Sequence, residues 1–378
     1  MKLEGVELRR IAMPLVAPFR TSFGTELDRE VVLVRVVSSD AEGWGECVAM
    51  AEPRYSSEYV DGAVDVLRRF LVPALLAEPD LDAHRAERVF AQFKGHPMAK
   101  AALEAALLDA QLRESGASLG SFLGAVHEAV PAGVSVGIMD SIPDLLNAVD
   151  GYLDDGYLRI KLKIEPGWDV APVRAVRERY GSDLLLQVDA NTAYTLADAR
   201  QLAKLDAFDL LLIEQPLPET DIAGHAELAR IVRTPICLDE SITSAAVAVH
   251  AINIGATRIV NIKPGRVGGY LEARRIHDVC AAHGVPVWCG GMLETGIGRA
   301  ANVALAALPN FTLPGDTSAS DRYYARDITD PFVLDDGHVR VPTGPGIGVQ
   351  PDPYALDAVT TSTEWLPAQD NAAGPSRR

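Results

Sequence analysis

Residues 184–216 read LLLQVDANTAYTLADARQLAKLDAFDLLLIEQP, and their pattern decides the fold. An apolar run ends at Asp189, the helical stretch ADARQLAKL follows, and a second apolar run ends at Glu214. Short apolar runs that alternate with amphipathic stretches are typical of parallel strands joined by helices. The segment therefore predicts one strand–helix–strand unit.

The same alternation extends on both sides of this unit. Eight β-rich runs predict eight strands, and they are Gly133–Ile138, Leu158–Lys163, Leu184–Asp189, Leu210–Glu214, Ile236–Asp239, Arg258–Lys263, Val285–Cys289 and Phe311–Leu313. Eight such units indicate an α/β fold, a (β/α)8-type barrel. An open doubly wound sheet is the alternative, because periodicity does not show closure. The first run lacks a glycine-rich dinucleotide fingerprint, which disfavours that alternative.

The chain on either side of the barrel differs in composition. Residues 1–50 predict strands in VELRRIAMPL, REVVLVRVVS and GWGECVAM, and helices are expected over 57–78 and 98–115. Strands followed by helices indicate an α+β domain. We therefore expect a capping domain at 1–125, the barrel at 126–320, a segment at 321–365 that returns to the capping domain, and a disordered tail at 366–378.

Charge and composition exclude several classes of partner. The 378 residues include 35 Lys and Arg against 52 Asp and Glu, a formal net charge of −17, so neither nucleic acid nor an anionic membrane is an expected partner. The sequence has no secretory h-region and no apolar run of about 18 residues. Four cysteines without CxxC spacing are typical of buried reduced thiols. We expect a cytoplasmic enzyme.

Charged residues end five consecutive predicted strands: Lys163, Asp189, Glu214, Asp239 and Lys263. The intervals between them are 26, 25, 25 and 24 residues. Active sites of such barrels lie at the carboxyl ends of the strands. Five charges in register therefore favour one shared site over unrelated solvated strand ends.

Three converging carboxylates, those of Asp189, Glu214 and Asp239, cannot all stay ionised without a cation. Oxygen ligands suit a hard ion such as Mg²⁺, and no cysteine or histidine follows these strands to favour zinc. Lys161 and Lys163 share one face of their strand, and Lys263 arrives from the far side of the barrel. A lysine near another cation has a lowered pKa and can act as a general base, which fits proton abstraction next to a carboxylate with metal-stabilised enediolate charge.

The motifs KLK, DAN, IEQP, LDES and NIKPGRVGG, in this order, resemble the enolase superfamily, muconate lactonizing enzyme subgroup. Longer stretches, including VAPFRTSFGT, GVSVGIMD, RIKLKIEPGWD, WCGGMLETGIGRAANVALA and LPGDTSASDRYY, resemble the o-succinylbenzoate synthase / N-acylamino acid racemase family over about residues 1–365. The resemblance implies a modified (β/α)7β barrel with an α+β capping domain, assembled as a homo-oligomer.

The resemblance also implies residue roles. It makes Asp189, Glu214 and Asp239 the Mg²⁺ ligands, with Mn²⁺ or Co²⁺ as substitutes, and Lys163 and Lys263 the acid/base pair. Lys161 then lies near the substrate carboxylate. Asn191 either hydrogen-bonds there or serves as a helix cap or turn residue. Glu240 either orients Lys263 or is a solvated carboxylate.

Two loops of the capping domain are expected over the barrel mouth, Pro18–Gly24 and Met50–Tyr55. Their apolar side chains, Phe19, Phe23, Met50 and Tyr55, would exclude water, and ordinary packing is the alternative. The remaining predicted pocket residues are Ser135, Gly291, Leu293, Asp316 and Tyr323. The pair Gly290–Gly291 would leave room for a long substrate arm.

The implied reaction is dehydration of 2-succinyl-6-hydroxy-2,4-cyclohexadiene-1-carboxylate to o-succinylbenzoate in menaquinone biosynthesis, together with racemisation of N-acylamino or N-succinylamino acids by a two-lysine 1,1-proton transfer. The substrate is thus a small carboxylate. Muconate cycloisomerase is one alternative activity, because Glu294 in MLETG stands where that relative has a similar glutamate. Dipeptide epimerase is another, although its Asp-x-Asp pair is reduced here to Asp316. A non-catalytic barrel would lack at least one of the five strand-end charges.

Overall fold

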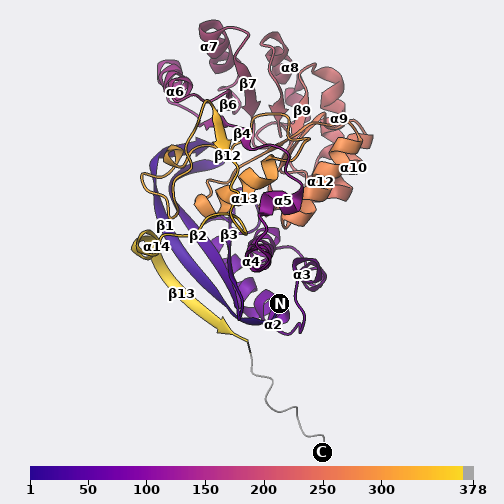
Figure 1. The fold of residues 1–378 in the computed structure, drawn as a ribbon. Coiled ribbons are helices and arrows are strands. Elements are labelled where there is room, and N and C mark those ends of the chain that lie inside the picture. The colour runs from indigo at the N-terminus through magenta and orange to yellow at the C-terminus, as the bar shows by residue number, and fades with distance from the viewer. Residues whose placement is uncertain (369–378) are drawn as a thin grey trace, which may run out of the picture.

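The computed structural model describes residues 1–368 and contains a parallel barrel sheet and an antiparallel capping sheet (Figure 1). The barrel sheet has seven strands in the order β11-β10-β9-β8-β7-β6-β5, and every neighbouring pair is parallel. The strands are β5 Gly133–Val136, β6 Arg159–Lys163, β7 Leu185–Asp189, β8 Ile213–Glu214, β9 Ile236–Leu238, β10 Ile259–Ile262 and β11 Val287–Cys289. The predicted α/β fold class is confirmed.

The eighth predicted strand, Phe311–Leu313, is not a regular strand in the structure. Thr312 N donates to Val287 O at 3.2 Å, and Gly133 N donates to Gly315 O at 2.7 Å. The segment therefore bonds to β11 on one side and to the start of β5 on the other. These bonds close the sheet, which excludes the open doubly wound alternative.

Helices follow the strands and surround the barrel (Figure 1). Several begin at a side-chain cap, such as Ser141, Asp221 and Ser244, that accepts a backbone N–H of the first turn. The α-helices are α6 Ile142–Asp154, α7 Val170–Tyr180, α8 Ala199–Leu202, α9 Ile222–Ile231, α10 Ala245–Asn253, α11 Pro264–Val267, α12 Tyr270–Ala282 and α13 Gly296–Ala306, with shorter turns η2 Leu196–Asp198, η3 Ala203–Ala207 and η4 Ser320–Arg322. Among residues 1–368, none of the helices combines the length and apolar character that crossing a bilayer requires.

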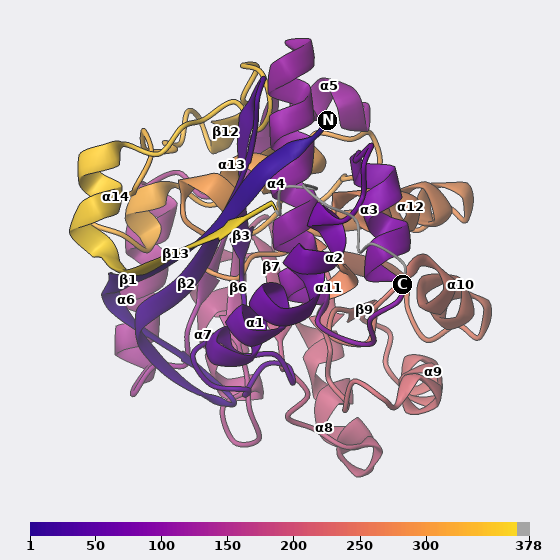
Figure 2. The same cartoon turned by 90° about the horizontal axis from the view of Figure 1, so that it is seen from below.

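The capping elements lie below the barrel in Figure 1 and in front of it in Figure 2. They are β1 Leu3–Thr21, β2 Gly24–Ser38, β3 Glu42–Cys47, α1 Val60–Val66, η1 Leu67–Leu71, α2 Val72–Leu76, α3 Ala83–Phe90, α4 Pro97–Ser115 and α5 Leu119–Leu123. After the barrel, β12 His338–Arg340 pairs with β4 Ala129–Pro131, and α14 Pro353–Val359 leads into β13 Thr360–Pro367. Strand β13 pairs antiparallel with β1 and includes Leu366 and Pro367, the first two residues of the predicted tail. Residues 369–378 of that tail lie outside the described residues.

Two buried carboxylates of the capping domain reach helix N-termini of the barrel. Glu104 of α4 accepts the backbone N–H groups of Tyr270 and Leu271, which begin α12. Glu46 of β3 accepts Thr295 Oγ1 at 2.7 Å and Gly298 N at 2.9 Å at the start of α13. Burial raises the pKa of Glu104 to about 8 and of Glu46 to about 7. The capping domain is thus fixed to the two helices that follow β10 and β11.

Close backbone approach joins β3 to α4. A Cβ at Gly45 would overlap the carbonyl oxygen of Ala102, and one at Gly43 would overlap that of Ala106. Neither neighbour is a flexible side chain that could move aside. The two glycines therefore allow the strand to lie directly on the helix.

We predict that Gly45→Ala lowers the stability of the protein by about 1–3 kcal/mol, because the added methyl group must displace helix backbone. Thermal unfolding measures the loss. Gly151→Ala is the matched control: this glycine lies within α6, and a Cβ there meets no atom within 4 Å. Its melting temperature should stay the same or rise. A Gly45→Ala protein as stable as Gly151→Ala would contradict the packing argument.

Candidate active site

The five strand-end charges meet at one end of the barrel, and all are buried. The sheet register sets Lys163 beside Asp189 and Asp189 beside Glu214 on adjacent strands. Asp239 and Lys263 follow β9 and β10 directly. Parallel strands place their carboxyl ends at the same edge, so residues far apart in the sequence become neighbours.

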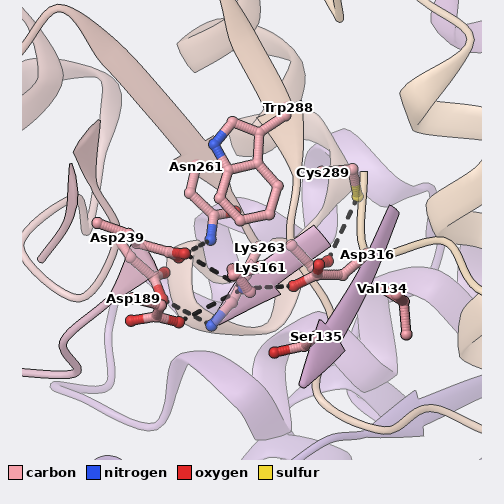
Figure 3. A network of polar contacts seen from close by, with 12 residues as sticks. Val134, Ser135, Lys161, Asp189, Asp239, Asn261, Lys263, Trp288, Cys289 and Asp316 are labelled. Carbon is pink, nitrogen blue, oxygen red and sulfur yellow. Dashed lines mark hydrogen bonds and ion pairs between the residues drawn. The ribbon is translucent and has the colours of Figure 1, made fainter. Parts of the chain in front are cut away.

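Each of the three carboxylates is paired with an ammonium group. Figure 3 shows part of this network, with Lys161 between Asp189 and Asp316. Lys163 Nζ lies 2.6 Å from Asp189 Oδ2, and Lys263 Nζ lies 2.7 Å from Asp239 Oδ2. Lys161 Nζ lies 3.2 Å from Glu214 and 3.4 Å from Asp189, so one cation bridges two carboxylates.

Further side chains complete these contacts. Asn261 Nδ2 donates to Glu214 Oε1 at 2.7 Å. Arg266 forms an ion pair with Asp239, and Lys263 Nζ donates to Tyr55 OH at 3.1 Å. Tyr55 comes from the capping domain. The barrel site therefore includes a capping residue in direct contact with one of its lysines.

Acidic neighbours set the direction in which the pKa of two lysines is shifted. Burial alone would lower the pKa of Lys161, but the charges of Asp316, Glu214 and Asp189 outweigh it and raise that pKa. The pKa of Lys263 is likewise raised, because Tyr55, Glu240 and other acidic groups outweigh burial. The expected lowering concerned one of the neighbouring lysines Lys161 and Lys163 beside a divalent cation, and it stays a prediction. In the described arrangement the carboxylates around Lys161 act in the opposite direction.

The carboxylates themselves respond unequally. Burial would raise the pKa of Asp189, but Lys163 and Lys161 together lower it. The pKa of Glu214 is raised, first by burial and then by the charge of Asp189. Glu214 thus has less compensating positive charge than its neighbour. A further cation would relieve this imbalance.

No group of three or more His, Cys, Asp and Glu side chains within residues 1–368 is arranged to hold a metal ion. Each of the three carboxylates faces a lysine ammonium instead. The donors nevertheless fit a hard divalent cation in kind: they are buried oxygens from three adjacent strands, and a cationic nitrogen already bridges two of them. Asp189, Glu214 and Asp239 are the residues that could hold such an ion.

Three further residues lie around Lys161. Asp316 was singled out from the sequence, whereas Arg159 and Trp288 were not. Asp316 Oδ2 lies 2.6 Å from Lys161 Nζ, and its Oδ1 lies 2.9 Å from Arg159. Lys161 Nζ lies 4.7 Å from the centroid of the Trp288 ring, and Arg159 Cζ lies 5.2 Å from the same centroid. Arg159 precedes Lys161 by two residues, so strand alternation could have placed it on this face. Trp288 carried no comparable signal.

A cavity with an empty volume of about 580 Å³ lies at this end of the barrel. Thirteen of the residues singled out from the sequence line it: Phe19, Phe23, Met50, Tyr55, Ser135, Lys161, Lys163, Asn191, Lys263, Gly291, Leu293, Asp316 and Tyr323. Thr21, Glu26, Arg29 and Met292 also line it and were missed. Thr21 lies in the predicted loop Pro18–Gly24, Glu26 and Arg29 lie further along β2, and Met292 lies between the predicted residues Gly291 and Leu293, but no sequence pattern marked them.

Asn191 and Glu240 contact one another beside the cavity. Asn191 Oδ1 accepts Lys163 Nζ at 2.6 Å, and its Nδ2 donates to Glu240 Oε1 at 3.0 Å. Glu240 is buried, which excludes the solvated alternative, and burial raises its pKa to about 7. Its described hydrogen bond goes to Asn191 and so supports Lys163, whereas it acts on Lys263 through charge.

The capping loops are bonded to the barrel mouth. Ser22 Oγ donates to the backbone oxygens of Ala190 and Asn191 at 3.4 and 3.3 Å. Arg29 donates to the carbonyls of Val48 and Ala49, and at 3.3 Å to that of Met292. One buried guanidinium thus ties the segment before Met50 to the barrel loop that contains Gly291.

Comparison with known proteins agrees with this architecture. Residues 5–124 match the family model described as "Mandelate racemase / muconate lactonizing enzyme, N-terminal domain", and residues 144–355 match "Enolase C-terminal domain-like". The chain is 70% identical to an N-succinylamino acid racemase from Amycolatopsis sp over 366 residues, 97% of this chain and 100% of the relative. It is 49% identical to an o-succinylbenzoate synthase from Geobacillus kaustophilus, over 95% and 96% of the two chains.

A solved structure shows the same fold over the full length. It is described as a member of the enolase superfamily from Listeria innocua and superposes with a TM-score of 0.94 at 39% identity, over 98% of this chain and 100% of the other.

A substitution at Phe19 tests whether the capping loop Pro18–Gly24 forms part of the substrate-binding cavity. We predict that Phe19→Ala raises the KM for substrates with an apolar arm by about tenfold, because an aromatic contact is lost, while metal affinity stays the same. Steady-state kinetics with arms of different length give the measurement. Phe70→Ala, at an exposed phenylalanine of η1, is the control. Unchanged kinetics of Phe19→Ala for every arm length would remove Phe19 from the binding site.

Proposed function

Because this chain belongs to the enolase superfamily, in the group named for mandelate racemase and muconate lactonizing enzyme, we propose that it removes the α-proton of a small carboxylate. Its reactions are dehydration of 2-succinyl-6-hydroxy-2,4-cyclohexadiene-1-carboxylate to o-succinylbenzoate and racemisation of N-succinylamino acids. Full-length relatives carrying each of these two names support both reactions. The observation that carries the proposal is a cavity lined by Lys163 and Lys263 above three buried carboxylates.

The two lysines belong to opposite sides of the barrel. Lys163 ends β6 and Lys263 follows β10, and three strands, β7, β8 and β9, lie between them. Both line the same cavity. A substrate α-carbon held in this cavity therefore has one lysine on each face, which is the arrangement that a 1,1-proton transfer requires.

Asp189, Glu214 and Asp239 would hold a divalent cation, and Mg²⁺ is the ion we propose, with Mn²⁺ or Co²⁺ as substitutes. When bound, the ion would supply positive charge at the substrate carboxylate and offset the acidic groups that hold the pKa of Lys263 high. Lys161, kept in place by Asp316 and Trp288, adds a fixed positive charge beside it.

The bond changes balance in both reactions. In dehydration, neutral Lys163 takes the proton from the carbon that carries the carboxylate. The carbon–oxygen bond of the 6-hydroxyl then breaks, the Lys163 ammonium returns the proton to the leaving hydroxyl, and water departs as the ring becomes aromatic. In racemisation, one lysine takes the α-proton and the other returns a proton to the opposite face. Phe19, Phe23, Met50 and Tyr55 cover the cavity and limit access of water to the carbanionic carbon.

Two alternative activities lose support at particular residues. Asp316, the one acid that matches the epimerase pattern, is engaged by both Lys161 and Arg159, so it is not free to bind a substrate ammonium. Glu294 accepts Met292 N at 2.8 Å and Asn302 Nδ2 at 3.0 Å, which is a structural role in the loop after β11. A homo-oligomeric assembly and a cytoplasmic location stay predictions.

Solvent-deuterium exchange followed by NMR distinguishes the two lysines. We predict that Lys263→Ala stops racemisation of an N-succinylamino acid, while the enantiomer whose proton faces Lys163 still exchanges. Dehydration should fall by about 10²–10³-fold in Lys263→Ala through loss of a charge, and further in Lys163→Ala through loss of the base. Lys204→Ala, at an exposed lysine bonded to Gln201, is the control. Rapid exchange of both enantiomers by Lys163→Ala would place the base elsewhere.

Chelation tests the metal ligands. We expect EDTA to abolish turnover and Mg²⁺ or Mn²⁺ to restore it. The reason is that a divalent cation would offset both the charge of the three carboxylates and the negative charge that develops on the substrate. Asp239→Asn should weaken Mn²⁺ binding by at least about tenfold in calorimetry, since an anionic ligand becomes neutral. Asp183→Asn, at an exposed aspartate, should bind Mn²⁺ as the wild type does. Full activity after exhaustive chelation would refute the metal assignment.

A further inference from the structure

Gln215 has an unusual backbone conformation. It follows Glu214 directly, is fully buried, and has a φ of +36°. L-amino acids other than glycine rarely adopt this left-handed region, which in folded proteins requires compensating contacts and is frequent at functional sites. Gln215 therefore needs specific partners that hold it in place.

Its side chain has five polar contacts, one of which is the approach of its amide nitrogen to His225 Nε2 at 3.4 Å. The amide oxygen accepts the backbone N–H of Asp239 at 3.0 Å and that of Ser241 at 3.1 Å. The amide nitrogen donates to Leu217 O at 3.1 Å and to Ser241 Oγ at 2.7 Å. A carboxamide, which both accepts and donates, matches this set, whereas a carboxylate or a thioether does not.

The backbone of Gln215 adds bonds to the neighbouring strands. Its N–H donates to Cys237 O at 2.9 Å, and its carbonyl accepts the N–H of Thr192 at 2.9 Å. Cys237 lies on β9, and Thr192 lies three residues beyond the end of β7. Gln215 directly follows β8, and it hydrogen-bonds to β9 and to the turn after β7. It thus connects the ends of the strands that carry Asp189, Glu214 and Asp239.

We propose that Gln215 is a positioning residue that sets the spacing of these three carboxylates for the divalent cation. Its amide fixes the backbone of Asp239 relative to that of Glu214, and its carbonyl fixes the turn after Asp189. The carboxylates are then arranged by buried hydrogen bonds that do not depend on the ion. This inference rests on the proposed function, which takes the three carboxylates as the metal ligands.

Mn²⁺ binding to metal-free protein, measured by calorimetry, tests the proposal. Gln215→Met keeps the volume of the side chain but leaves the N–H groups of Asp239 and Ser241 without their acceptor. We expect its Kd for Mn²⁺ to rise about tenfold or more, and its activity to recover in part at saturating Mn²⁺. Gln187→Met is the matched control, because Gln187 is a buried amide of β7 whose Nε2 has no hydrogen-bond partner. Its Kd should stay within about twofold of the wild type.

Gln215→Asn separates the amide bridge from the backbone conformation. Asparagine tolerates a positive φ better than glutamine, but its amide is one methylene shorter and cannot make the same bonds. We expect weakened Mn²⁺ binding here too, and this milder variant carries the test if Gln215→Met does not fold. A lowered melting temperature with unchanged Kd in either folded variant would overturn the proposal and leave Gln215 a structural role. Wild-type protein that bound no Mn²⁺ would overturn the proposed function and this inference with it.

Discussion

The constraint on which the rest of the structure depends is the burial of three carboxylates side by side at the ends of adjacent strands. Buried charges are tolerated only where opposite charges and hydrogen bonds compensate them. The barrel supplies that compensation from every side: Lys163 for Asp189, Lys161 for Glu214, and Lys263 with Arg266 for Asp239. The lysines proposed as acid and base are therefore also the groups that compensate the acidic cluster.

The scaffold around this cluster fixes both walls of the cavity. Parallel register aligns the strand ends, and Gln215 bonds three of them together. The capping domain is joined to the barrel at the N-termini of the helices that follow β10 and β11, through Glu104 and Glu46. The capping loop Met50–Tyr55 is thereby held against the barrel, so Tyr55 can contact Lys263 across the domain boundary.

Sequence reasoning was strongest where chemistry and periodicity coincide. The alternation of eight β-rich runs with helical stretches predicted the barrel, and the even spacing from Lys163 to Lys263 predicted strand ends that meet at one end of it. The family resemblance supplied the capping loops. The periodicity of a sequence predicts which face of a strand or helix a side chain occupies, but it does not predict which residue that side chain contacts. Trp288 and the amide bridge of Gln215 were therefore missed, since their roles arise from three-dimensional neighbours. The eighth strand was wrong in detail because two backbone bridges are enough to close the sheet.

The charge of the whole chain also says little about the charge of its site. The formal net charge is −17, yet four cationic residues, Arg29, Lys161, Lys163 and Lys263, line the cavity beside two acidic ones. Of the acidic pair, Asp316 is already neutralised by Lys161 and Arg159. Surface charges lying farther away than the Debye length, about 8 Å at physiological ionic strength, are largely screened, whereas these buried groups act at contact distance. The lysines are themselves paired with buried carboxylates, Lys163 with Asp189 and Lys263 with Asp239, so the divalent cation of the proposed function is the charge that would attract an anionic substrate to this site.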